Sequence, residues 1–225
     1  MEWGLSKTGK EKPVEMKEWK KGIKLLEYGT ENKVYIIFLG LGILMLVQGG
    51  NWEIGAFLLT MGLLQPLGWS SNLEWTGMVA ASPKKKMLCL SIPEMVICVG
   101  GWISYFLIVV INWLNICLGG KSSSMEEKEG LLKAFFVLFL VLSWGGIAYK
   151  RFKLGIILGV GSLIVIEELI RFVSRTKWIG EVDRKEVYLI GLALALIGII
   201  LSVVLRRALY HLPVSKLISP DKQSQ

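Results

Sequence analysis

The residues whose side chains could do chemistry are mostly basic, and they lie between long apolar segments of the chain. The densest basic cluster is Lys84-Lys85-Lys86, and the pairs Arg184-Lys185 and Arg206-Arg207 flank the last apolar segment. Lysine and arginine bind the phosphates of lipid headgroups and of RNA, as well as acidic protein surfaces. These groups are therefore candidate contacts for RNA, lipid or a protein partner, and they also orient a membrane protein.

The sequence lacks the residue patterns of the common catalytic and metal-binding sites. It has one histidine, His211, with no Ser or Cys at a spacing that would make it half of a nucleophilic pair. It contains no P-loop, no glycine-rich dinucleotide motif and no HExxH. The cysteines Cys89, Cys98 and Cys117 match no zinc or redox spacing, so we expect them to fill apolar space. We therefore expect no cofactor or metal site.

Six apolar segments, each almost free of charge, separate these polar groups. Hydrophobic residues make up 53% of the sequence and the mean hydropathy is +0.54, above the usual range of soluble domains. A helix needs roughly 20 apolar residues to cross a hydrocarbon core of about 30 Å. Ile92–Leu118, Leu131–Tyr149 and Val187–Leu205 reach that length, whereas Val34–Val47, Ile54–Trp69 and Leu154–Ile170 are shorter. We expect an all-α, polytopic integral membrane protein with about five to six membrane helices.

The two ends of the chain differ in composition from its middle. Residues 1–33 are rich in lysine, and apolar residues between Met16 and Leu26 share one helix face. A basic amphipathic helix of this kind is typical of a membrane surface, and the alternative is a solvated helix packed on its own protein. We divide the chain into a basic amphipathic leader (1–33), a multi-spanning membrane domain (34–210) and a polar C-terminal tail (211–225).

The positions of lysine and arginine bear on topology, because these residues accumulate in cytosolic loops. With six crossings and a cytosolic N-terminus, most of them fall on the cytosolic side. If Leu154–Ile170 lay in the membrane interface instead, the bias would be similar, but the C-terminus would lie on the other side. Charge therefore leaves both topologies and the number of crossings open.

Polar residues within the apolar segments are few, which bears on the class of function. Glu167 and Glu168 have Arg171 within one helical turn, so we expect a local ion pair at the membrane edge. A channel or transporter needs a polar path, for which the sequence offers mainly these glutamates together with Asn112 and Asn115. We expect a scaffold, and the alternative is an oligomeric membrane channel or transporter of cellular origin.

Two local signals concern helix contacts and helix ends. Gly155 and Gly159 form a GxxxG pattern, which lets helices approach closely and is a candidate packing site, within one chain or in a homo-oligomer. Pro93 suits the first turn of a helix, and a carboxylate such as Glu94 suits the positive end of the helix dipole. We therefore expect the third membrane helix to begin near Pro93.

Two stretches resemble non-structural protein 2A of the flavivirus polyprotein. The first is ILMLVQGG at residues 43–50, followed by a second apolar run, WTGMVAA at 75–81 and the basic cluster at 84–86. The second is ILGVGSLI at 157–164, followed by a charged loop and YLIGLALA at 188–195. The order and spacing of these stretches and the total length are similar to those of the family, so the chain resembles a divergent member of it.

This resemblance implies both a location and a role. Such a protein would be an integral component of the host endoplasmic reticulum membrane and of the viral RNA replication complex. It would bring genomic RNA and structural proteins together during virion assembly, remodel or permeabilise membranes, and antagonise interferon signalling. Its implied partners are membrane lipid, viral RNA and the other viral non-structural and structural proteins, and it would not be an enzyme.

Overall fold

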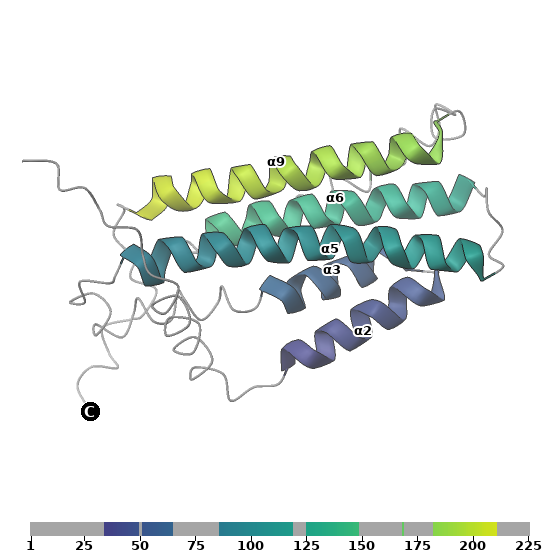
Figure 1. The fold of residues 1–225 in the computed structure, drawn as a ribbon, viewed down its shortest axis with the longest axis horizontal. Coiled ribbons are helices and arrows are strands. Elements are labelled where there is room, and N and C mark those ends of the chain that lie inside the picture. The colour runs from purple at the N-terminus through teal and green to yellow at the C-terminus, as the bar shows by residue number, and fades with distance from the viewer. Residues whose placement is uncertain are drawn as a thin grey trace, which may run out of the picture.

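The computed structural model describes residues 34–49, 51–64, 86–118, 125–148, 168 and 182–210, and these residues contain helices and no strand. The elements are α2 (Val34–Gln48), α3 (Trp52–Leu64), the π-helical turn η1 (Met87–Ser91), α5 (Ile92–Cys117), α6 (Met125–Ala148) and α9 (Arg184–Tyr210), shown in Figure 1. The expected all-helical class is confirmed for this part of the chain.

Three stretches of the described chain are long and apolar enough to cross a membrane. They are Cys89–Cys117, Met125–Gly146 and Arg184–Tyr210, while α2 and α3 are shorter apolar helices. This supports a membrane-embedded protein, with fewer full-length spans among the described residues than the five to six expected. The leader 1–33, the tail 211–225 and the segment Leu154–Ile170, apart from Glu168, lie outside the described residues.

The long helices α6 and α9 lie side by side and run in the same direction, as Figure 1 shows. Residue numbers rise together along their interface, where Gly191 contacts Phe135, Gly198 contacts Leu142 and Ser202 contacts Gly146. All three contacts bring a residue with a small side chain, or none, against the facing helix. Small residues let helices approach closely, which drives association where lipid removes the hydrophobic force between helices. The two helices therefore begin at one end of the bundle and finish at the other.

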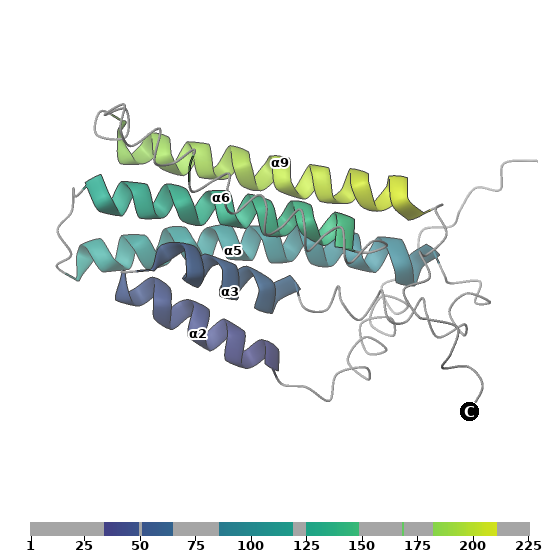
Figure 2. The ribbon, with the colours of Figure 1, turned by 180° about the vertical axis from the view of Figure 1, so that it is seen from behind.

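The helix α5 runs antiparallel to α9, since Gly101 faces Ile199 and Glu94 pairs with Arg207. The helices α2 and α3 form a hairpin whose turn contains Gly49, which has φ +69°. This left-handed conformation suits glycine at the end of a helix, and the Gly49 N–H donates to the Leu46 carbonyl at 3.3 Å. Figure 2, seen from behind, shows α3 between α2 and the long helices.

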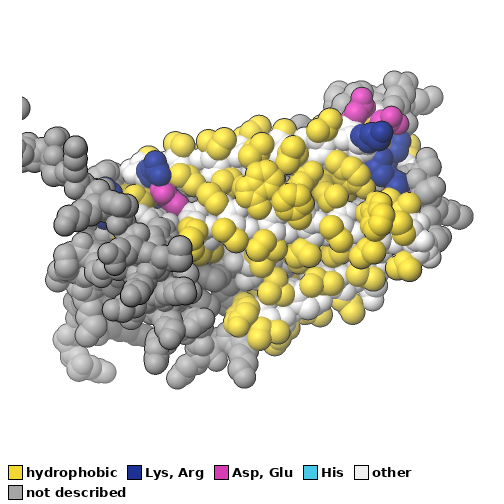
Figure 3. Space-filling model, in the orientation of Figure 1, with side chains coloured by type: hydrophobic (Ala, Val, Ile, Leu, Met, Phe, Trp, Pro, Cys, Tyr) yellow, Lys and Arg dark blue, Asp and Glu magenta, His cyan; other side chains and the backbone are white. Residues whose placement is uncertain are grey.

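The outer surface of the bundle is apolar between two charged ends, as Figure 3 shows for one face. Leu189, Ile200 and Val204 of α9 and Ile36 and Ile37 of α2 are among the large apolar side chains that are exposed. Soluble monomers rarely expose so many contiguous apolar residues. Together with the helix lengths, this surface supports a membrane-embedded protein.

Candidate functional site

The first polar contact within the bundle forms around Pro93, near the start of α5. A proline has no N–H, so the carbonyl of Cys89, four residues earlier, loses its regular α-helical donor. The helix adopts the π-turn η1 here, and the buried side chain of Arg206 approaches from α9. Its Nε and Nη2 both donate to the Cys89 carbonyl oxygen, at 3.2 and 3.1 Å. Arg206, which is only 1% exposed, therefore supplies donors where the proline cannot.

The neighbouring residue Arg207 makes a second link between the same two helices. Its Nε and Nη2 donate to the two carboxylate oxygens of Glu94, at 2.7 and 2.9 Å. This two-bond geometry is the strong form of an arginine–carboxylate contact. Glu94 therefore does more than complement the dipole of its own helix, because it ties the start of α5 to the end of α9. We call this end of the bundle, with Lys86, Glu94, Arg206 and Arg207, the basic end.

The opposite end of the bundle joins α6 to the start of α9. Arg184 Nη2 donates to Glu127 Oε2 at 3.2 Å, and Lys128 Nζ donates to the Val182 carbonyl at 2.8 Å. The Asp183 N–H donates to Glu186 Oε2 at 3.1 Å, which is half of a capping box at the start of α9. We call this end the mixed-charge end, and its contacts hold the two parallel helices at a common starting level.

A third polar cluster lies inside the bundle between α5 and α9. The Tyr188 hydroxyl donates to Asn112 Oδ1 at 2.6 Å, and the Tyr105 hydroxyl donates to the Tyr188 carbonyl at 3.1 Å. Asn112 is 2% exposed, so its amide has little access to the surroundings. Asn115 donates to the Leu46 carbonyl of α2 at 3.2 Å. Both asparagines that could have lined a polar path therefore bond to neighbouring helices.

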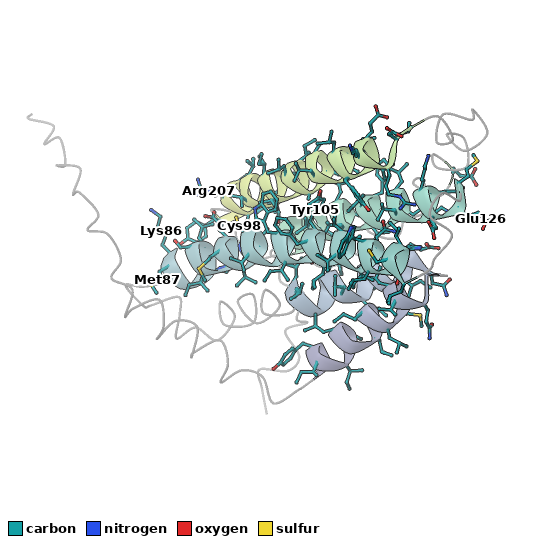
Figure 4. All side chains as sticks on the ribbon, turned by 45° about the vertical axis from the view of Figure 1, so that its right-hand side comes forward. Lys86, Met87, Cys98, Tyr105, Glu126 and Arg207 are labelled. Carbon is teal, nitrogen blue, oxygen red and sulfur yellow. The ribbon has the colours of Figure 1, made fainter. Side chains whose placement is uncertain are left out.

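The structure places the predicted basic residues at both ends of the bundle. Lys86 is exposed at the basic end, where Figure 4 shows it on the same side of the molecule as Arg207. Lys84 and Lys85 precede the described residues of η1. Lys185 is exposed at the mixed-charge end, beside the ion-paired Arg184.

The predicted packing residues Gly155 and Gly159 lie outside the described residues. The described helices use other small residues for the same purpose, and these were not singled out from the sequence. Gly191, Ala195, Gly198 and Ser202 are spaced so that they form one stripe along α9, and all are buried. This spacing in YLIGLALALIGIILS was the available signal, because small residues four and three apart mark a helix-packing face.

Comparison with protein-family models, with curated proteins and with solved structures gives no match for this chain. The function must therefore be argued from the geometry. Among the described residues there is no group of three or more His, Cys, Asp or Glu that could hold a metal ion. The hydrogen bonds and ion pairs described above join different helices, so the arrangement is suited to holding a membrane bundle in one register.

Proposed function

We propose that this protein is a multi-spanning membrane scaffold with six crossings. The parallel direction of α6 and α9 supports this number. Both helices begin at the mixed-charge end, so the chain must return there between Ala148 and Val182. We assign that crossing to the apolar segment Leu154–Ile170, which lies outside the described residues. With this segment in the interface instead, α6 and α9 would have to run in opposite directions.

We place the basic end in the cytosol. The start of α2 points toward this end in Figure 1, and in this topology the lysine-rich residues 1–33 would be on the same side of the membrane. Lysine and arginine near the ends of membrane helices favour the cytosolic side. In this orientation Lys84-Lys85-Lys86 and Arg207 lie on the cytosolic side, whereas Arg184 and Lys185 lie on the far side.

We favour a scaffold over a channel because the two asparagines that could line a polar path bond to neighbouring helices. Asn112 accepts from Tyr188, and Asn115 donates to Leu46. A conducting path needs polar groups that face an aqueous lumen. No observation on the described residues favours the channel.

We further propose that the scaffold belongs to a viral RNA replication complex in the host endoplasmic reticulum membrane. There it would support virion assembly, remodel or permeabilise membranes, and antagonise interferon signalling. The support for this role is the ordered resemblance to flavivirus non-structural protein 2A, together with the basic end. In our topology this end faces the compartment that holds the viral RNA. Of the basic residues that could contact RNA, this topology leaves those at the basic end. Arg206 is excluded because it is buried and bonds to Cys89, so the proposed contact residues are Lys84, Lys85, Lys86 and Arg207.

The test is ultraviolet cross-linking of viral RNA to the full chain in cells that carry the replicating genome. Changing Lys84, Lys85 and Lys86 to Ala should lower RNA recovery and particle release several-fold. The matched control Lys185→Ala, at the opposite end, should leave both unchanged. Equal RNA recovery from the two variants would contradict the proposed contact. The side of the membrane on which each loop lies must also be determined for the triple variant, since loss of three lysines can invert the topology of a membrane protein.

A further inference from the structure

The apolar lengths of the two outer sides of the bundle differ. The uncharged part of α9, Val187–Leu205, is about 29 Å long at the α-helical rise, close to the hydrocarbon core of about 30 Å. The uncharged part of α2, Val34–Val47, is only about 21 Å long. Lys33 precedes it, and Gln48 and the turn residues Gly49 and Asn51 follow it.

Glycine contacts fix how these two helices line up. Within the hairpin, Leu39 lies against Gly62 and Leu46 against Gly55, so Ile37 is level with Leu64, the end of α3. Leu64 in turn contacts Gly100 of α5, and Gly101 contacts Ile199 of α9. Ile37 on α2 is therefore near the level of Ile200 on α9. By the same register, Val47 is near the level of Leu189.

All four of these side chains face outward. Ile37 and Val47 are 58% and 54% exposed, while Ile200 and Leu189 are 60% and 63% exposed. Ile37 is nearer to the end of the α2 apolar segment than Ile200 is to the end of the α9 apolar segment. The same holds for Val47 compared with Leu189. The apolar surface at α2 thus ends before that at α9 at both ends of the bundle. A helix that was only displaced along the membrane normal would end earlier at one end and later at the other.

We propose that α2 contacts the acyl chains of a locally thinned bilayer, while α9 contacts a bilayer of ordinary thickness. A hydrophobic segment shorter than the hydrocarbon core can be accommodated by thinning of the surrounding lipid. The partner is membrane lipid, because the exposed face of α2 is apolar and polar residues bound the segment at both ends. This inference rests on the membrane placement proposed above and adds a lateral asymmetry to it.

Spin-label depth measurements on the full chain in dioleoylphosphatidylcholine vesicles test this proposal. Single cysteines would replace Ile37, Ile200, Val47 and Leu189, one at a time, in a background without Cys89, Cys98 and Cys117. Relative accessibility to oxygen and to a water-soluble nickel reagent gives each label's depth. We expect both α2 labels to be shallower than their α9 counterparts, by about 4 Å at each end from the difference in helix length.

The two pairs of labels separate thinning from simpler arrangements. A tilted bundle in a flat bilayer would make one α2 label shallower and the other deeper than its counterpart. Equal depths in both pairs, or differences of opposite sign, would overturn the proposal while leaving the membrane placement intact. Four labels that are all accessible from water would instead overturn the membrane placement itself. Circular dichroism of each labelled protein confirms that the helices are retained.

Discussion

Arg206 of α9 donates two hydrogen bonds to the Cys89 carbonyl, which Pro93 leaves without its regular helical donor. Pro93 and Arg206, 113 positions apart in the sequence, thus act on the same carbonyl. The proline lacks the N–H that would donate to it, and the arginine donates in its place. In lipid an unsatisfied backbone carbonyl is costly, so this contact helps to fix α9 against α5.

This relationship predicts an interaction between two substitutions. Arg206→Met should lower the free energy of unfolding by about 1–3 kcal/mol, because the buried Cys89 carbonyl loses two charged donors. Pro93→Ala returns an N–H to the helix, so it should recover part of that loss in the Arg206→Met background. Equilibrium unfolding in mixed detergent micelles measures all four combinations.

The double-mutant cycle isolates the part of the Arg206 effect that depends on Cys89. Strictly additive effects of the two substitutions would show that the proline and the arginine act independently. Val204→Met, at an exposed position two residues before Arg206, is the control and should change stability little.

The parallel pairing of α6 and α9 predicts a strong effect at Gly191. A Cβ atom there would lie 2.4 Å from Phe135 Cδ2, too close for any real contact. Gly191→Ala should therefore destabilise the protein by about 1–3 kcal/mol despite the higher helix propensity of alanine. The same unfolding measurement checks this, and Phe135→Leu should relieve part of the effect.

Gly40→Ala is the matched control for that substitution. A Cβ at Gly40 has no neighbour within 4 Å, so the change should be neutral or slightly stabilising. If the two alanine variants were equally stable, α6 and α9 would not be packed as described.

The Tyr188–Asn112 hydrogen bond predicts a moderate and specific loss. Tyr188→Phe removes the donor to Asn112 Oδ1 and should cost about 0.6 kcal/mol, the average for side-chain bonds between membrane helices, and no more than about 1.7 kcal/mol. Asn112→Leu added to Tyr188→Phe should cost less than Asn112→Leu alone, because the bond is already absent. Tyr35→Phe on α2 serves as the control for loss of a hydroxyl, and an equal effect there would contradict a specific role for the bond.

Much of the helical architecture could be predicted from the sequence, because uncharged length is a direct signal in a membrane protein. Leu131–Tyr149 and Val187–Leu205 both fall largely within observed helices, α6 and α9. Helix α6 begins earlier, at Met125, with Glu126 and Glu127 in its first turn, where the helix dipole favours acidic residues. Hydropathy alone misses such a start because these residues are charged.

The direction and pairing of the helices were harder to predict. Charge counts left two topologies open, since they depend on the sum of many loops and not on which helices touch. The pairing is decided by small residues such as Gly191 and Gly198, whose role appears only when their partners Phe135 and Leu142 are known. Likewise, Pro93 indicated a helix start, and α5 is assigned from Ile92, but the π-helical turn η1 continues the helical backbone back to Met87. The arginine that completes this region lies on a distant helix.

The central claim is that α6 and α9 enter the membrane from the same side and that the chain crosses between them. The sequence contains no Asn-x-Ser/Thr acceptor, so glycosylation sites inserted one at a time report only on their own loop. Sites with a short spacer would be placed in residues 119–124, 171–181, 70–83 and the C-terminal tail, and the full chain translated with microsomes. We expect glycosylation at 119–124 and at 171–181, and none at 70–83 or in the tail. Modification at only one of 119–124 and 171–181 would place the starts of α6 and α9 on opposite sides and contradict the account.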